Sequence, residues 1–460
     1  MNKICLIKAG SAVVTREDGS LDLNTIQDIG KMISYIVKNG WSPILVSSGA
    51  SSAGKGFLGT HSISNDTIKP ITASIGQSNL IAYYINLLKI HSPSTQVAQL
   101  LINRRNLTNI NVYKFVKKNL LTMLSNNILP IINENDVLWE NEINFSDNDH
   151  LASVIASMLH VHTVVLFSDV DAIYTKNPQL YSDAKKIKHL DQNYENWNIS
   201  IDDSNVSNGG MKSKLDVFRM MSILGINVHL LSKNFLSNSN HILDILNLKS
   251  ENTGTHLISK KKKSFSFYKK WLLSSSVPKG IIIISKKGAL ALSETNNIKH
   301  RTNLYCIGIE NFFGKFNKGD IVSLRDEKFN LIGFGKTSYS FDDLLEKKCE
   351  QGKVFIHNDF VISIKDDFFV DRERELIEQH VYNLKVLEGY RVKQNKPKII
   401  IDNKRKGKSK ENNSYIETIE LDEENSSNIR YEAKKSCNKF NIPSCNIDDW
   451  IIFRVLLGKK

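Results

Sequence analysis

Short apolar runs alternate with helix-patterned segments through the first part of the chain, and this alternation restricts the possible folds more than any other feature. The strand-like runs are KICLIKAGSAVV (3–14), SPILVS (42–47), TQVAQLLI (95–102), ILPIIN (128–133) and TVVLFS (163–168). Between them, apolar residues at helical spacing cover 21–40, 70–90, 111–126 and a segment from about 148. This β-α-β-α order predicts an α/β fold, with a mostly parallel open sheet and helices on both faces.

The composition is that of a soluble protein with more than one domain. The chain has 460 residues, which predicts about three domains. Hydrophobic residues make up 41% and charged residues 24%, and no apolar run approaches the roughly 18 residues that a membrane helix needs. The first residues lack the apolar core and cleavage site of a secretory signal. We therefore expect no membrane association.

The cysteines are scattered and include no C-x-x-C motif. They are Cys5, Cys306, Cys349, Cys437 and Cys445. This pattern predicts reduced thiols, a cytoplasmic location and no structural zinc site. His160 and His162 form an H-x-H pair without an evident Cys or carboxylate partner, so we expect structural histidines and no protein-bound metal.

The formal net charge of +13 leaves two interpretations open. A basic chain can bind nucleic acid or other anions. Alternatively, the abundance of Lys, Asn and Ile reflects an AT-biased genome without selection for binding. An RNA-binding or regulatory protein therefore stays an alternative to an enzyme.

The alternation of predicted strands and helices ends after Leu248, and we divide the chain into four parts. Residues 1–255 form the α/β domain, and 256–276, with the run Lys260–Lys263, form a basic linker. Residues 277–365 contain strand-like runs such as KGIIIIS, GALALS and GDIVSLRD, which predict a small β-rich domain. Residues 366–460 form an extension that the sequence does not assign.

A glycine-rich stretch, GASSAGKG, follows the second strand. Gly49, Gly54 and Lys55 have the spacing of a phosphate-binding P-loop, but Gly56 replaces the hydroxyl residue that holds Mg²⁺. The next residues, FLGTHSIS, lack the helical pattern that a P-loop requires. We interpret the stretch as a loop whose backbone amides and serine hydroxyls bind an anion, with a plain turn as the simpler alternative.

Polar residues follow several of the predicted strands. The stretches are KAGSA (8–12), INENDV (132–137), FSDNDHLASVIA (145–156), LFSDVDAIYTKNP (166–178) and SNGGMKSKLDV (207–217). Parallel strands place their carboxyl ends at one edge of the sheet, where ligands bind. The helix start predicted after Gly210 also favours phosphate. Each stretch alone is modest evidence for a ligand site, since turns and helix caps use the same residue types.

In their order, these stretches resemble the motifs of the amino acid kinase family. The motifs are K-x-G, S-S-G-A, N-E-N-D, D-N-D, S-D-V-D-A-x-Y-T-x-x-P and G-G-M-x-x-K. Within the family they are most similar to the glutamate 5-kinases, which catalyse the first step of proline biosynthesis. The resemblance covers about 1–255, and 277–365 resembles a PUA domain. It implies an amino acid kinase fold and transfer of the γ-phosphoryl group of ATP to the side-chain carboxylate of L-glutamate.

This reaction needs no general base, because the acceptor carboxylate is already ionised, but it must bring two anions together. The resemblance implies that Lys8 and Lys214 neutralise phosphate charge and that Asp149 holds these lysines in place. Lys212 is the alternative to Lys214, and the family spacing G-G-M-x-x-K selects Lys214.

The resemblance also implies the residues that bind the two substrates. Glutamate contacts are expected from Ser48, Gly49, Ala50, Asp136 and Asn148. ATP contacts are expected from Lys8, Gly10, Ser11, Ser168, Asp169, Asn208, Gly209, Gly210, Met211, Lys212, Ser213 and Lys214. Mg²⁺ is expected to bridge the nucleotide phosphates with few protein ligands. The sequence departs from the family at Ala12, which lacks a hydroxyl, and at Asn208, where Thr is usual.

The same resemblance implies partners. We expect a homo-oligomer, either dimer or tetramer, and a glutamyl phosphate reductase that consumes the unstable product. A sister kinase of the same fold, acting on aspartate, N-acetylglutamate, carbamate or UMP, stays an alternative.

Overall fold

The computed structural model divides into two compact units, Met1–Ser276 and the residues from Val277 onward, and each is described by itself. The structure describes residues 2–58, 65–138, 148–197, 199, 210–249, 253–259, 265–293, 303–328, 330–350, 352–357 and 361–363. The extension predicted over 366–460, together with Asn208, Gly209 and Lys260–Lys263, lies outside these residues.

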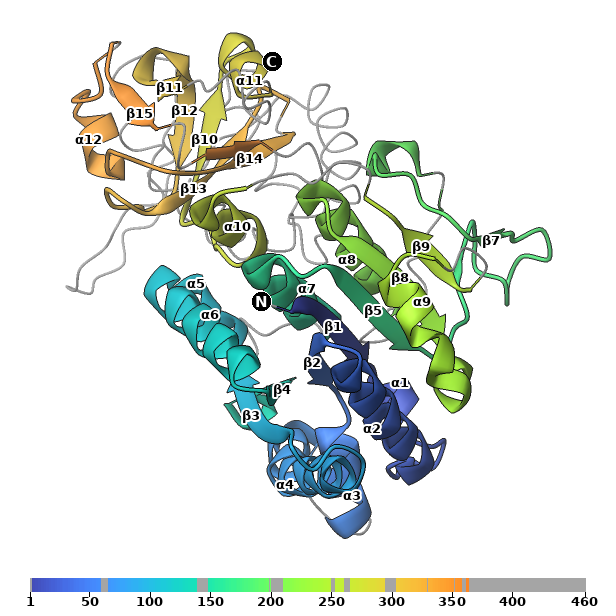
Figure 1. Cartoon of the computed structure of the whole chain (residues 1–460). Helices are drawn as coiled ribbons and strands as arrows, with labels where there is room; N and C mark the ends of the chain where they lie inside the picture. Colours follow the sequence, from blue (N-terminus) through green and yellow to red (C-terminus); the bar gives the residue numbers. More distant parts are fainter. Residues whose placement is uncertain are drawn as a thin grey trace, which may run out of the picture. The chain divides into compact units, whose positions relative to one another are not determined.

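A seven-stranded sheet forms the centre of the first unit (Figure 1). Its strands, in spatial order, are β3 (Gln96–Ile102), β4 (Ile128–Glu134), β2 (Trp41–Ser47), β1 (Lys3–Ala9), β5 (Thr163–Ser168), β8 (Asn227–Ser232) and β9 (Thr255–Leu257). All neighbouring pairs are parallel except β8 and β9. The predicted mostly parallel sheet is thus confirmed, and β1, β2 and β5 are almost wholly buried, as strands covered on both faces should be.

Helices connect the strands of this unit. They are α1 (Ser11–Val14), α2 (Leu23–Lys38), α3 (Ala50–Leu58), α4 (Asn65–His91), α5 (Arg104–Thr108), α6 (Ile110–Ser125), α7 (Asn148–Leu159), α8 (Met211–Leu224), α9 (Ile242–Leu246) and α10 (Phe267–Ser274). The sequence sets α2 locally, because Asp22 caps it by accepting a hydrogen bond from the Thr25 amide. Ile26 and Ile29 then lie at helical spacing and pack in one core with Tyr84 of α4.

Short elements complete the first unit. Strands β6 (Ile173–Tyr174) and β7 (Lys186–Ile187) pair antiparallel, and single turns of 3-10 helix occur at η1 (Asp136–Leu138) and η2 (Tyr194–Asn196). A longer 3-10 segment, η3 (Lys233–His241), precedes α9. No helix in the described part of the chain is long and apolar enough to cross a membrane.

The glycine-rich stretch after β2 is helical, so its prediction as a loop was wrong. Helix α3 begins at Ala50 and continues through the glycines to Leu58. A Cβ atom on Gly54 would lie 1.8 Å from the carbonyl oxygen of Thr72 in α4, and one on Gly76 would lie 1.8 Å from that of Ala50. These two glycines therefore let the backbones of α3 and α4 touch, so that tertiary packing stabilises a helix of low intrinsic propensity.

The segment 256–276 is not the free linker that its lysines predicted. Its described part contains α10, in which Trp271, Leu272 and Leu273 are buried. Ser266 caps this helix by accepting a hydrogen bond from the Lys269 amide at 3.3 Å. The apolar face of α10 packs on the first unit, and the boundary between the units follows Ser276.

The second unit is β-rich, as predicted. Its main sheet has the order β12 (Ile309–Phe313), β10 (Gly280–Ile284), β13 (Ile321–Arg325), β14 (Leu331–Lys336) and β16 (Val361–Ser363), and β11 (Leu304–Tyr305) pairs with β15 (Val354–Ile356). Two helices, α11 (Lys286–Ser293) and α12 (Phe341–Leu345), and the turn η4 (Cys306–Gly308) complete it. The run GALALS is part of α11 rather than a strand, because Ala and Leu favour helix and the Ser285 hydroxyl accepts a hydrogen bond from the Gly288 amide.

Cys306 and Cys349 form a disulfide, which corrects the expectation of reduced thiols. Their Cα atoms are 5.7 Å apart although 43 residues separate them in the sequence. The Cys306 amide bonds to the carbonyl oxygen of Lys353, next to β15, so strand pairing brings the two cysteines together. Cys5 is a buried free thiol, and burial raises its pKa.

Candidate active site

Three charged side chains from separate parts of the sequence meet at one edge of the central sheet. Lys8 lies near the end of β1, Asp149 in the first turn of α7 and Lys214 in the first turn of α8. The Nζ of Lys8 pairs with Oδ1 of Asp149, and the Nζ of Lys214 lies 3.3 Å from Oδ2 of the same carboxylate. We call these three residues the charged trio. Their exposed fractions are 4%, 0% and 6%, so the ion pairs are shielded from water.

The charge state of the trio follows from its geometry. Burial alone would raise the pKa of Asp149, but the positive charges of Lys8 and Lys214 outweigh burial and lower this pKa to about 2. Asp149 is therefore an anion at neutral pH. One buried carboxylate thus holds two ammonium groups.

Ser213 adds a neutral contact to the trio. Its hydroxyl lies 3.0 Å from Oδ2 of Asp149 and 2.9 Å from the carbonyl oxygen of Gly210. Gly210 is the N-cap of α8, and Met211 and the exposed Lys212 begin the helix. Lys214, which the family spacing selects over Lys212, pairs with Asp149 at 3.3 Å.

The residue before Asp149 belongs to a second, uncharged network. Asn148 donates from Nδ2 to the hydroxyl of Ser48 and to Oδ1 of Asn133, both at 2.8 Å. Its own Oδ1 accepts from the Glu134 amide at 3.3 Å. Asn133 in turn donates to Oε1 of Gln77 at 2.7 Å. This amide network joins the ends of β2 and β4 to α4 and the start of α7.

Asn133 and Gln77 were not among the predicted site residues. Asn133 lies in the quoted stretch INENDV, directly after an apolar run, so its position at a strand end was a usable signal. Gln77 lies inside α4, where nothing in the local sequence separates it from other polar helix residues. Only the tertiary contact identifies it.

Ser48, Gly49 and Ala50 form the turn from β2 into α3. The Ser48 amide donates to the carbonyl oxygen of Ala9 at 3.0 Å, which ties this turn to the end of β1. Gly49 has a φ of +101°, and a Cβ there would lie 2.6 Å from Val14. Glycine is therefore required at the point where the chain reverses beside the trio.

The remaining predicted residues lie at neighbouring positions of the same edge. Gly10 follows β1, and a Cβ on it would approach the Nζ of Lys8 to 3.0 Å, so glycine leaves room for this ammonium group. Ser11 is exposed at the start of α1. Ser168 ends β5 and bonds to the exposed Asp169 at 2.9 Å. Asp136 is half-buried in η1, beyond β4. Asn208 and Gly209 lie outside the described residues.

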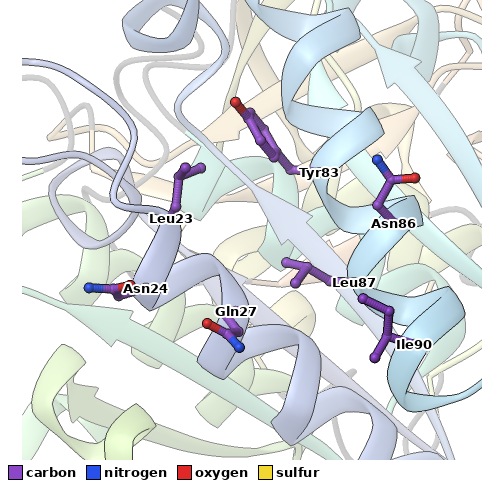
Figure 2. Close-up of a pocket in the computed structure, with 7 residues that line it drawn as sticks. All are labelled: Leu23, Asn24, Gln27, Tyr83, Asn86, Leu87 and Ile90. Carbon is purple, nitrogen blue, oxygen red and sulfur yellow. The ribbon is translucent and has the colours of Figure 1, made fainter.

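A pocket of about 220 Å³ opens between α2 and α4 (Figure 2). Its lining consists of Leu23, Asn24, Gln27, Tyr83, Asn86, Leu87 and Ile90. None of these residues belongs to the trio or to the amide network. The pocket carries no charged side chain, so it does not suit either anionic substrate of the predicted reaction.

Two family patterns match the chain. Residues 3–232 match the amino acid kinase family, and residues 293–358 match the PUA domain. The first match contains the whole of the trio and the amide network, and the second falls in the β-rich unit.

Curated relatives extend over both units. A protein named glutamate 5-kinase from Dehalococcoides mccartyi is 32% identical over 356 residues, which are 75% of this chain and 91% of that protein. Glutamate 5-kinase 2 from Bacillus subtilis is 31% identical over 75% of this chain and 90% of its own length. A glutamate 5-kinase from Halalkalibacterium halodurans is 29% identical over 82% of this chain and 98% of its own length.

Proposed function

The chain belongs to the amino acid kinase family, and we propose that it transfers the γ-phosphoryl group of ATP to the side-chain carboxylate of L-glutamate. The product is L-glutamyl 5-phosphate, the first intermediate of proline biosynthesis. One observation carries this proposal: Asn148 and Asp149 are adjacent, and they join an amide network at Ser48 to a carboxylate that holds two lysines. An amino-acid site and a phosphate site thus meet at the start of α7.

The two lysines provide the electrostatic part of the catalysis. An oxygen of the glutamate carboxylate forms the new bond to the γ-phosphorus, while the bond to the oxygen that bridges the β- and γ-phosphates breaks and ADP leaves. Lys8 and Lys214 contact the migrating group and offset its negative charge, which brings the two anions within reach of each other. Asp149 holds both ammonium groups at the same point, and Ser213 orients this carboxylate.

Glutamate is held by the amide network and its neighbours. Ser48 and Asn148 bind the substrate carboxylates by hydrogen bonds, and the amides of Gly49 and Ala50 face the reacting carboxylate. Asp136 pairs with the α-ammonium group, since an acidic side chain suits a cation. Asn133 and Gln77 act as positioning residues, because they fix the orientation of Asn148.

ATP is bound between β1, β5 and α8. Gly10 and Ser11 approach the phosphates at the end of β1, and Ser168 and Asp169 contact the nucleotide at the end of β5. Gly210 to Lys214 contact its phosphates at the N-terminus of α8, where the helix dipole favours anions, and the family resemblance adds Asn208 and Gly209 to these contacts.

The residues present fit a Mg²⁺ ion that arrives with the nucleotide. Both oxygens of Asp149 are engaged by lysines, and the described residues contain no cluster of three His, Cys, Asp or Glu side chains. The nucleotide phosphates and water would hold the ion, which would supply additional positive charge there. The protein's part is to hold those phosphates through Lys8 and Lys214.

The proposal extends to the cellular context of the reaction. We place the enzyme in the cytoplasm, as a dimer or tetramer. Its product is a mixed anhydride that hydrolyses readily, so a glutamyl phosphate reductase is the expected consumer. RNA is not part of this proposal, although the PUA domain leaves RNA binding as a separate question.

A substrate panel tests the function. ADP release is measured with ATP, Mg²⁺ and one of L-glutamate, L-aspartate, N-acetylglutamate, carbamate or UMP, and hydroxylamine traps any acyl phosphate as a hydroxamate. We expect hydroxamate with glutamate alone. Turnover of UMP without turnover of glutamate would assign the chain to a sister activity, and no turnover with any acceptor would favour a binding protein on a kinase scaffold.

A further inference from the structure

Two segments without acidic residues pack against each other in the first unit. The sequence contains no Asp or Glu from Arg104 to Asn133 and none from Asn252 to Ser276. The first segment forms α5 and α6, and the second contains α10. Trp271 of α10 donates from Nε1 to the carbonyl oxygen of Leu107 at 3.0 Å, and the Phe267 ring lies 5.4 Å from that of Tyr113. The lysines of α6 and α10 therefore lie on one surface to which neither helix contributes a carboxylate.

Lys117 and Lys270 occupy the half-buried centre of this surface. The Nζ of Lys117 lies 5.1 Å from the centre of the Phe267 ring, and Lys270 follows Phe267 by one turn of α10. Burial lowers the pKa of Lys117. Burial, and then the charge of Lys117, lower the pKa of Lys270 to about 8. In the part of the chain that the structure describes, neither ammonium group has a carboxylate partner.

Two half-buried like charges without a counter-ion are unfavourable unless a ligand supplies the opposite charge. Lys114 and Lys118 lie on α6 within one turn of Lys117, and both are exposed. They widen the positive surface around the pair. Phe115, which is 63% exposed, adds an uncovered ring on the same helix.

We propose that Lys117 and Lys270 form the centre of a binding site for a phosphate-bearing anion. The site is distinct from the charged trio. Tyr113, which anchors α10, lies against Ser157 in the last turn of α7. Asp149 lies in the first turn of the same helix, about 12 Å away at 1.5 Å per residue. The phosphate belongs either to a small polyphosphate or to a single-stranded nucleic acid, whose bases stack on exposed aromatic rings.

Competitive acetylation of the full-length protein tests the site directly, because mass spectrometry reads each lysine separately. At pH 8, we expect trace acetic anhydride to modify Lys270 about tenfold faster than the exposed Lys38 of α2, since more of its amine is neutral. Pyrophosphate should protect Lys117 and Lys270 but not Lys38. Protection by a single-stranded oligonucleotide that extends to Lys114 and Lys118 would identify nucleic acid as the source of the phosphate. If neither probe protects Lys270, the proposal is wrong.

A variant gives an independent measurement that does not depend on labelling. Lys270→Met removes one charge and keeps the apolar stem, so we expect a melting temperature equal to or above that of the wild type. Pyrophosphate also resembles part of ATP, and its effect on melting is therefore compared among the wild type, Lys270→Met and the control Lys38→Met. We expect a smaller stabilisation in Lys270→Met alone. If pyrophosphate raises the melting temperature of all three proteins equally, the proposed site is wrong.

Discussion

Asn148 and Asp149 are adjacent in the sequence but make different contacts. The amide of Asn148 turns to Ser48 and Asn133, whereas the carboxylate of Asp149 turns to Lys8 and Lys214. Both side chains start from the first turn of one helix, so the proposed glutamate pocket and the proposed phosphate site are held at a fixed separation. Fixed separation matters for this reaction, because positioning supplies much of the rate.

The hydroxyl of Ser48 gives a prediction about substrate affinity. Ser48→Ala removes a hydrogen-bond partner of Asn148 and of the proposed glutamate carboxylate, and a lost bond of this kind is equivalent to about tenfold in binding. We expect KM for glutamate to rise about tenfold, with kcat and KM for ATP changed little. Steady-state kinetics with each substrate varied in turn provides the measurement. Ser51→Ala is the control, since its hydroxyl bonds to Thr72 within the α3–α4 contact. If Ser48→Ala and Ser51→Ala change KM for glutamate equally, Ser48 does not bind the substrate.

His229 on β8 gives a prediction about acid stability. It is fully buried, and burial, followed by the nearby His256, lowers its pKa from the usual 6.5 to about 3. The unfolded chain therefore binds a proton below pH 6.5 that the folded chain excludes, so stability falls as pH decreases from 6.5 towards 3. By pH 5 this linkage amounts to about 2 kcal/mol.

His229→Phe should reduce this acid-dependent loss. Urea unfolding at pH 7 and pH 5 measures it, and replacing the exposed His241 by Asn serves as the control. The assignment fails if His229→Phe and the wild type lose the same free energy of unfolding between the two pH values.

At the scale of elements, the sequence predicted the sheet better than the helices that cover it. The strands β1, β2, β3, β4 and β5 all occur where apolar runs were found, because a buried parallel strand needs such a run in its own sequence. Helices α3 and α10 were missed because tertiary contacts stabilise them. Glycines in α3 are unfavourable for a helix in isolation, and the packing of α3 on α4, the next helix along the chain, compensates for them. The lysines in and before α10 favoured a solvated linker, and the partner of α10, α7, is distant in sequence.

The same reasoning explains which site residues could be predicted. Lys8, Asp149 and Lys214 stand in motifs whose spacing marks them, and the structure brings them together. The link from Asn133 to Gln77 depends on how α4 lies over β4, which no local pattern encodes.

The contact between α3 and α4 gives a prediction that opposes helix propensity. Gly54→Ala should raise the intrinsic stability of α3, but its Cβ would overlap the Thr72 carbonyl in α4. We expect a net destabilisation of about 1–3 kcal/mol in urea unfolding and a loss of activity, because α3 starts at Ala50, in the turn that we propose binds glutamate. Gly30→Ala in α2 is the matched control, since its Cβ would meet Leu87 only at 3.4 Å. A Gly54→Ala protein as stable as Gly30→Ala would show that the helices can separate without cost.

At the scale of the whole molecule, the charged trio and the disulfide belong to different units. The trio lies within Met1–Ser276, whereas Cys306 and Cys349 lie in the second unit. Sequence spacing could not reveal this pair, because 43 residues separate the cysteines and the pairing of β11 with β15 joins them. We therefore expect that a change in the stability of the second unit leaves the proposed catalytic residues unaffected.

Reduction of the disulfide tests this independence. A closed loop of this length stabilises the folded state by about 4 kcal/mol in the chain-entropy description. We expect reduction, or Cys306→Ser, to lower the melting temperature of the second unit while kcat for glutamate stays the same. Cys5→Ser, in the core of the first unit, should instead lower the melting temperature of the first unit and reduce kcat, with the melting temperature of the second unit unchanged. Alkylation of both Cys306 and Cys349 in the native, non-reduced protein would show that the pair is not bonded.

The most direct test of the central claim compares glutamate-dependent hydroxamate formation in the wild type, Lys8→Ala and Lys214→Ala. If both lysines act on one migrating phosphoryl group, each variant should lose about 10²-fold or more in kcat while circular dichroism shows a folded protein. The exposed Lys212, replaced by Ala, should lose far less. A folded Lys8→Ala or Lys214→Ala protein that retains turnover close to the wild type would contradict the account.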